Sequence, residues 1–255
     1  MNLVEYQLLS LFFIVAAAIL LIVAERLFPY NKQKILRIGF WTDLIYYNAI
    51  QTFILGIIIS WLIEIIDEST LISRYGIISD LPIIWQLLFF IVTHDLYIYW
   101  FHKLQHKNKY LWRLHEAHHS PKEVDWLSGV RSHGLEIFIN QTVEFLPIIL
   151  LGAAPEVAVL KGMVSAIWGM YIHANIDIRS GKLQYIINGP EMHRWHHSTS
   201  KGRNRNFATK LAIWDWIFGT YYFPKEQKPE EYGLKNNFPN NYFAQFLFAF
   251  RKFKR

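Results

Sequence analysis

Three histidine boxes, HKLQH at residues 102–106, HEAHH at residues 115–119 and HRWHH at residues 193–197, organise this chain of 255 residues. All eleven histidines lie between His94 and His197. Residues three and four positions apart share one face of a helix, so each box directs two or three imidazoles the same way. Imidazole is the commonest metal-ligand side chain, and the pattern therefore predicts a metal site built from several helices.

The number of imidazoles indicates more than one ion. A structural zinc takes four ligands and a catalytic zinc three, whereas the boxes offer eight histidines and His173 a ninth. That number suits two ions with four or five imidazoles each. Zinc has no redox chemistry and little use for so many ligands, so the sequence favours iron. The nearby acids are interpreted as partners that orient imidazoles: Asp95, Glu116, Glu123, Glu136 and Asp177.

The composition indicates a membrane protein. Hydrophobic residues make up 53% and aromatic residues 17% of the chain, which is too apolar for an ordinary soluble domain. The chain has no cysteine, which excludes disulfides, thiolate metal sites, iron–sulfur clusters and cysteine nucleophiles. The net charge of +6 is interpreted as basic loops on the cytoplasmic side of a membrane, and nucleic-acid binding is not expected.

Three apolar stretches, residues 8–24, 44–63 and 81–101, predict membrane spans. The loop after the first stretch is basic, whereas residues 64–80 carry Arg74 alone against four acids. By the positive-inside rule the first loop is cytoplasmic, and the boxes at the end of the third stretch lie on that side too. In a bacterium this membrane would be the inner one. A cleaved signal peptide over the first stretch is the minority alternative.

Two further apolar segments, residues 137–151 and 157–171, are separated by GAAP at residues 152–155. Each would form a helix of about 22 Å, short of a ~30 Å hydrocarbon core, which predicts a helical hairpin that dips into the membrane and returns. The expected fold is an all-α integral membrane bundle of three spans and a hairpin, with a cytoplasmic histidine-rich helical cap. The expected divisions are N-terminal spans (1–80), a histidine-box catalytic domain (81–224) and a tail with an interfacial amphipathic segment (225–255).

Four segments resemble the motifs of the fatty acid hydroxylase / sterol desaturase superfamily. They are HDLYIYWFH at residues 94–102, LWRLHEAHHS at 111–120, NGPEMHRWHH at 188–197 and WDWIFGT at 214–220. The resemblance covers about residues 85–224 and is strongest to the alkylglycerol monooxygenase and bacterial sterol desaturase-like branches. One departure follows the last box, where the family often has Asn-Tyr-Gly and this chain has Asn206-Phe207-Ala208, without the tyrosine hydroxyl.

The resemblance implies a membrane-bound non-haem di-iron oxygenase, with two iron ions and O2 as co-substrate. Such an enzyme hydroxylates or desaturates a C–H bond of a lipid such as a sterol, fatty acyl chain or alkylglycerol. By position, the implied iron ligands are His102, His106, His115, His118, His119, His173, His193, His196 and His197. Supporting catalytic roles fall to Asp95, Glu136 and Asp215, while His94 and His133 are either ligands or residues that orient ligands.

The implied partners are a lipid from the bilayer and an external electron donor. The sequence has no glycine-rich dinucleotide motif, so a reductase with a ferredoxin-like or cytochrome b5-like carrier is expected to supply electrons.

Two other functions stay open on the sequence. A membrane-embedded zinc-dependent lipid hydrolase would use Glu116 as its base, but the His-Glu-x-x-His spacing is met only through His115 and His119. A metal transporter would place its ligands near the middle of the membrane, whereas these histidines crowd one end of the third span. Dependence on O2 and reductant separates the oxygenase from the hydrolase, and metal flux without product formation would support the transporter.

Overall fold

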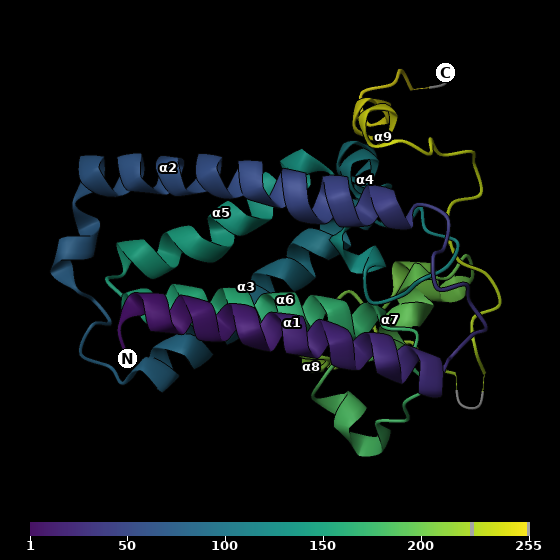
Figure 1. Ribbon diagram of the computed structural model, residues 1–255, viewed down its shortest axis with the longest axis horizontal. Coiled ribbons are helices and arrows are strands. Elements are labelled where there is room, and N and C mark those ends of the chain that lie inside the picture. Colours follow the sequence, from purple (N-terminus) through teal and green to yellow (C-terminus); the bar gives the residue numbers. More distant parts are fainter. Residues whose placement is uncertain (225–226, 254–255) are drawn as a thin grey trace.

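The computed structural model describes residues 1–224 and 227–253. Over these residues the chain is all-helical and has no strand beyond two isolated bridges, which confirms the predicted fold class. The long helices run along the longest axis of the molecule, and most of the short helices gather at one end (Figure 1). The expected tail includes residues 225, 226, 254 and 255, which lie outside the described residues.

Three helices are long and apolar enough to cross a membrane: α1 (Leu3–Leu27), the continuous helix of η1 (Thr42–Gln51) and α2 (Thr52–Thr70), and α3 (Ile83–Lys107). Large apolar side chains on α1 face outward, with Leu8 63% and Phe12 64% exposed. Side chains of this kind suit contact with lipid. The second helix extends to Thr70 because Glu64 and Glu68 favour helix although they are not apolar.

The hairpin of α5 (Gly134–Leu150) and α6 (Pro155–His173) is longer than its apolar segments predict. At 19 residues, α6 is about 28 Å long. The hairpin tip meets the loop between α2 and α3, where the N–H of Ile78 donates to the carbonyl of Leu151 at 3.1 Å. Gly152, with φ +70°, allows this approach, since a Cβ there would lie 2.7 Å from Gly76 Cα. The hairpin therefore runs to the far end of the bundle rather than dipping part of the way.

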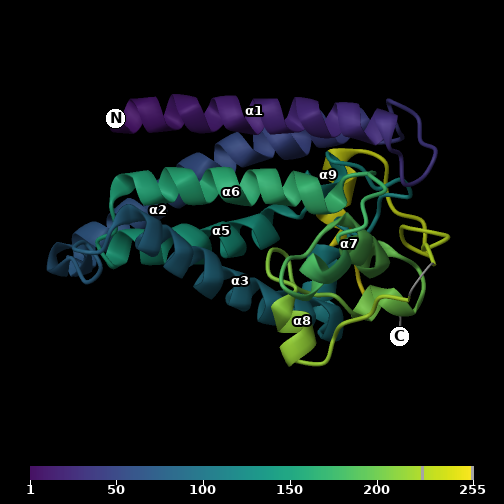
Figure 2. The ribbon, with the colours of Figure 1, turned by 90° about the horizontal axis from the view of Figure 1, so that it is seen from below.

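The hairpin is enclosed by the three spans. Helix α1 packs along α6 while α2 packs against α5, and α3 contacts both arms (Figure 2). A small apolar core of Phe90, Ile148 and Val157 joins α3 to the hairpin. This packing brings the C-terminal ends of α3 and α6 to the same end of the molecule (Figure 1).

Short helices build a cap on that end. They are α4 (Lys109–His115), η3 (Ser128–Val130), η4 (Gly181–Tyr185), α7 (Pro190–His197), η5 (Lys201–Asn204), α8 (Ile213–Ile217) and α9 (Tyr242–Phe248); η2 (Ile72–Tyr75) lies in the loop between α2 and α3. Helix α9 rests on the start of the second span, where the Tyr242 hydroxyl donates to Gln51 Oε1 at 2.9 Å. It leaves Phe243 and Leu247 exposed, and its interfacial role stays a prediction.

Candidate metal centre

The nine histidines implied as ligands lie in two clusters at the cap end of the bundle. The first cluster is His102, His106, His115, His119 and His196, and the second cluster is His118, His173, His193 and His197. The ligand atoms of each cluster lie within 4.8 Å of one another, so each cluster could hold one metal ion. Their sizes match the four or five imidazoles per ion expected from the sequence, and their assignment as iron ligands is taken up below as a proposal.

Each of the two boxes that carry three histidines serves both clusters. His118 faces the second cluster while its neighbour His119 faces the first. The last box does the reverse, because His196 on α7 faces the first cluster and His197 the second. Consecutive residues of a helix point about 100° apart, which explains the division on α7, whereas His118 and His119 lie in the turn after α4. Each cluster therefore contains histidines from more than one box, and the boxes connect the two clusters.

The loop after η5 orients imidazoles of the first cluster. His102 Nδ1 donates to the carbonyl of Phe207 at 2.8 Å, and His196 Nδ1 donates to the carbonyl of Arg205 at 2.8 Å. A carbonyl oxygen only accepts, so each Nδ1 carries the proton and each Nε2 keeps its lone pair. The phenyl ring of Phe207 packs beside both imidazoles, with centroid separations of 5.7 and 5.8 Å. The residue that replaces the family tyrosine thus packs directly on the first cluster.

Two side chains orient further members of the first cluster. His115 Nδ1 donates to Glu136 Oε1 at 2.8 Å, and His106 Nδ1 lies 3.2 Å from Asn204 Oδ1. Hydrogen bonds of this kind set the tautomer and the ring direction of a metal-binding histidine. The structure thus places Glu136 against an imidazole, and its catalytic role stays a prediction.

The Asp215 side chain holds the same loop by binding the backbone of the loop. Its carboxylate accepts from the N–H groups of Phe207 and Ala208, each at 2.9 Å, and from the Thr220 hydroxyl at 2.6 Å. It contacts no imidazole among the described residues. The influence of Asp215 on the first cluster is therefore indirect and passes through the Phe207 carbonyl.

Asp95 does not orient an imidazole, and that expectation is wrong. Its carboxylate accepts from the Thr209 hydroxyl and from the N–H groups of Lys210 and Leu211, at 2.7 to 2.9 Å, and from the Trp214 indole at 3.1 Å. Buried on α3, it fastens the loop before α8 to the third span. The same expectation is wrong for two other acids, because ion pairs join Glu116 to Arg251 and Asp177 to Lys228.

Buried ring nitrogens of the first cluster have no hydrogen-bond partner among the described residues. These atoms are Nε2 of His102, His106, His115 and His196 and both ring nitrogens of His119. A buried polar atom without a partner costs roughly 1–3 kcal/mol. Several such lone pairs facing one another fit the donor set that an imidazole-bound cation requires.

The tautomers of two histidines in the second cluster also indicate a metal site. His173 Nδ1 donates to the carbonyl of Gly169 at 2.7 Å, and His118 Nδ1 to the carbonyl of Arg131 at 3.3 Å. Both Nε2 atoms therefore carry lone pairs, yet they lie 3.2 Å apart. Two lone pairs cannot form a hydrogen bond, whereas a shared cation satisfies both. The residues of both clusters fit a metal ion.

The imidazoles of the cap are neutral. Burial, reinforced by the neighbouring imidazoles, lowers the pKa of each well below its usual value in His115, His118, His119, His193, His196 and His197. Neutral imidazole is the form that binds a metal ion.

The structure places His94 and His133 outside both clusters. His133 caps α5, stacks on Phe246 with centroids 4.4 Å apart and donates through Nε2 to the Phe246 carbonyl at 3.1 Å. It thereby ties α9 to the bundle. His94 lies two turns before His102 on α3, where Lys161 Nζ approaches its Nδ1 at 3.1 Å.

A cavity of about 200 Å³ lies between α3, α5 and α6 and opens onto both clusters. Histidines of both clusters form one end: His102, His115, His118, His173 and His193. Its middle is apolar, with Ile98, Phe101, Trp168 and Ile172. Its other end is polar, with His94, Asn140, Glu144, Ser165, Thr209 and Lys210. A molecule in this cavity would meet both clusters at once.

Sequence reasoning missed the loop of residues 204–208. Its contacts to His102 and His196 come from backbone carbonyls, which no side-chain pattern records. Its one signal was Asn206, whose φ of +54° is a left-handed conformation that asparagine adopts more readily than most residues. The Asn206 amide also fixes the loop by donating to the carbonyls of Met192 and Tyr222 at 3.0 and 2.7 Å.

The fold and the clusters define a multi-pass membrane protein with two buried all-histidine sites beside one cavity. Comparison with known proteins agrees with this class. The profile described as "Fatty acid hydroxylase" matches residues 87–220, more than half of the chain. The chain belongs to the fatty acid hydroxylase family. No solved structure matches it.

The curated relatives are lipid-modifying enzymes by name. Ornithine lipid hydroxylase OlsE of Rhizobium tropici is 31% identical over 172 residues, 67% of this chain and 52% of that protein. Alkylglycerol monooxygenase of Homo sapiens is 33% identical over 160 residues, 61% of this chain and 34% of that protein. Methylsterol monooxygenase 1 of Rattus norvegicus is 29% identical over 151 residues, 57% of this chain and 50% of that protein. The matched part thus spans about half or less of these relatives.

Proposed function

We propose that this protein is a membrane-bound di-iron oxygenase that hydroxylates or desaturates a lipid with O2 and external electrons. The observation that carries the proposal is the cavity that contacts both histidine clusters and has an apolar middle. The names of the relatives, which include ornithine lipid, alkylglycerol and methylsterol enzymes, support a lipid substrate.

Three groups of residues would have distinct roles: binding iron, orienting the imidazoles and enclosing the substrate. The first and second clusters would each hold one iron ion, and bound iron would supply O2 activation. The carbonyls of Phe207 and Arg205 and the carboxylate of Glu136 keep Nε2 of their imidazoles directed inward. Ile98, Phe101 and Trp168 exclude water from the substrate and hold an apolar segment of it beside the clusters.

The clusters would lie on the cytoplasmic side of the membrane. The basic loop between α1 and η1 is at the same end of the bundle as the cap (Figure 1), and positive charge favours the cytoplasmic side. Electron carriers are available there. The substrate would reach the cavity from the bilayer, between the third span and the hairpin.

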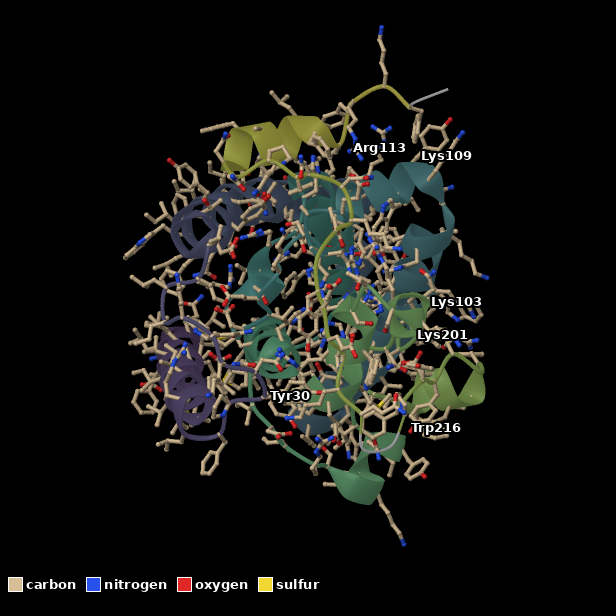
Figure 3. The ribbon with its side chains drawn as sticks, turned by 90° about the vertical axis from the view of Figure 1, so that its right-hand side faces the viewer. Tyr30, Lys103, Lys109, Arg113, Lys201 and Trp216 are labelled. Carbon is tan, nitrogen blue, oxygen red and sulfur yellow. The ribbon has the colours of Figure 1, made fainter. Side chains whose placement is uncertain are left out.

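A basic depression beside the first cluster is the place we propose for the electron donor. It has a volume of about 520 Å³ and contains His106, Trp112, Lys107 and Arg203. The Trp112 ring is 5.0 Å from the His106 ring and 5.3 Å from the His119 ring, so the depression reaches the first cluster. Lys103, Lys109 and Lys201 lie on the same end of the molecule (Figure 3). An acidic carrier protein matches this charge.

The two alternatives have less support. The base of a zinc hydrolase would be Glu116, but its carboxylate pairs with Arg251 at 2.8 Å instead of facing the clusters. A transporter needs ligands along a path across the membrane, whereas both clusters lie at one end of the bundle (Figure 1).

The test is oxygen transfer from isotopically heavy O2. Iron-loaded protein in liposomes, given a reductase and an acidic carrier, is incubated with a membrane lipid extract. We expect one lipid of the extract to gain a heavy oxygen atom or lose two hydrogens, and we expect neither change in the absence of reductant. Hydrolysed lipid without O2 consumption would contradict the proposal and favour the hydrolase.

A further inference from the structure

The polar end of the cavity has no role in holding the clusters, yet it is built from three helices and a loop. Lys161 of α6 is fully buried, and its ammonium donates to Glu144 of α5, to Ser165 Oγ at 3.1 Å and to His94 Nδ1 of α3 at 3.1 Å. Ser165 also donates to Glu144 Oε1 at 2.5 Å. Ionisable side chains inside a membrane bundle are costly and mark functional sites more often than structural ones.

The charged groups of this network are paired with each other, whereas Nε2 of His94 has no hydrogen-bond partner among the described residues. The ammonium of Lys161 has three protons, and each meets one of its three partners. The charges of Lys161 and Glu144 cancel. The network thus forms a neutral polar wall, with Glu144 and Ser165 facing the cavity and Lys161 behind them. A hydrocarbon chain end would be poorly placed against that wall, since it would cover polar groups without pairing them.

Among the described residues, Lys210 is the charged group of this wall that lacks a partner. Its backbone is fixed, because its N–H donates to Asp95 Oδ1 at 2.9 Å and its carbonyl accepts from the N–H of Asn188 at 2.9 Å. Its side chain lines the cavity and is 8% exposed. Among the described residues no carboxylate lies within 4.0 Å of its ammonium, and no side chain or backbone group hydrogen-bonds to it. The Lys210 ammonium thus has three donors free to meet acceptor oxygens of a molecule in the cavity.

We propose that Lys210 binds an oxygen acceptor of the lipid substrate, a carboxylate, phosphate or carbonyl oxygen, and thereby selects the carbon that faces the clusters. The inference rests on the proposed function and names its substrate class. Asp95, which fixes Lys210, lies seven residues before His102 on α3, a rise of about 10 Å. The acceptor site thus lies about two helical turns from the clusters, so the substrate is oxidised close to its polar group, in or next to the head-group region, rather than near the end of a long hydrocarbon chain.

The experiment measures binding without turnover, so it needs neither O2 nor reductant. The probes are palmitate, hexadecyl phosphate and hexadecane, which share a chain length and differ in their acceptor oxygens. Each is titrated against the full chain, purified in detergent, and the thermal shift is recorded. Hydrogen bonds to a charged group are worth enough to change affinity by about tenfold or more. We expect wild type to bind one or both anionic probes at least ~10-fold more tightly than hexadecane.

The variants are Lys210→Met, Lys210→Arg and, as a matched control, Lys182→Met on the exposed turn η4. We expect Lys210→Met to lose the preference, Lys210→Arg to keep most of it and Lys182→Met to keep all of it. Metal content shows that each variant is folded. The anionic probe that binds identifies carboxylate or phosphate as the acceptor. Equal binding of all probes to wild type, or a preference that survives in Lys210→Met, would overturn the inference. Failure of the oxygen-transfer test with the preference intact would instead overturn the proposed function.

Discussion

Asp215 and His102 bind the same peptide group from opposite sides. The Asp215 carboxylate accepts from the N–H of Ala208 at 2.9 Å, and the carbonyl of that peptide, which belongs to Phe207, accepts from His102 Nδ1 at 2.8 Å. Hydrogen bonds in such a chain polarise one another, so a carboxylate on one side strengthens the acceptor on the other. A carboxylate that never touches an imidazole thus fixes the direction of a predicted ligand.

Replacement of Asp215 by asparagine tests this relay, the chain of hydrogen bonds from Asp215 through the Phe207–Ala208 peptide to His102. The amide has only one acceptor oxygen, and its NH2 group would face a backbone N–H that is now left unpaired. We expect Asp215→Asn to lower the free energy of unfolding by about 2 kcal/mol and to reduce metal in the first cluster. Metal analysis and thermal denaturation check this. Asp177→Asn is the control, since Asp177 pairs with Lys228 near the surface and should change stability by less than about 1 kcal/mol. A variant Asp215→Asn with full metal content would show that the relay has no effect.

His196 and His197 offer a matched pair of adjacent substitutions. They are neighbours on α7 but belong to different clusters. We expect His196→Ala to lose the ion of the first cluster and His197→Ala that of the second, with each variant still inserted in the membrane and each inactive. His133→Ala, outside both clusters, should keep both ions. Metal content with spectroscopy of the remaining ion distinguishes the variants, and identical spectra from both would mean that the clusters are not separate sites.

Removal of metal should destabilise the protein. Without a cation, the lone pairs of His118 and His173 face each other 3.2 Å apart in a buried site. A ligand that binds only the folded state at a hundred times its Kd adds about 3 kcal/mol of stability. Chelator treatment should therefore lower Tm, and either iron or zinc should restore it, while only iron restores O2 uptake. An unchanged Tm after complete removal would argue against metal in the buried clusters.

Charge reversal at the basic depression tests the proposed electron entry. Lys107 and Arg203 line it beside His106 and Trp112. We expect Lys107→Glu and Arg203→Glu to raise KM for an acidic carrier several-fold, with little change when dithionite replaces the carrier. The wild-type rate with carrier should fall with salt, because exposed charges are screened. Lys182→Glu is the control. Equal effects on the carrier and dithionite reactions would place the defect elsewhere.

The fold class was readable from sequence because its signals are periodic and local. The spans follow from apolar length and the clusters from residues three and four apart. The length of the hairpin was underestimated because it depends on the close packing of Gly152 against Gly76, a contact between segments far apart in the sequence. For the same reason, helix geometry alone could not show that His118 and His119 face different clusters.

The contacts of the acids were harder to predict than the grouping of the histidines. Asp95 stands next to His94 in the sequence, yet it binds the backbone of residues 210 and 211, more than a hundred residues away. Proximity in sequence suggested an imidazole partner, but the carboxylate is more fully paired by N–H groups of an otherwise unsatisfied loop. Lys161 and Glu144 lie 17 residues apart on different arms of the hairpin, so their ion pair required the hairpin to fold.

The iron content per chain of protein purified in detergent from iron-fed cells, with O2 uptake measured on the same sample, tests most directly whether this protein is a di-iron oxygenase. Two buried imidazole clusters predict about two iron ions per chain and reductant-dependent O2 uptake that a membrane lipid extract stimulates. A single zinc ion per chain without O2 uptake would contradict the account.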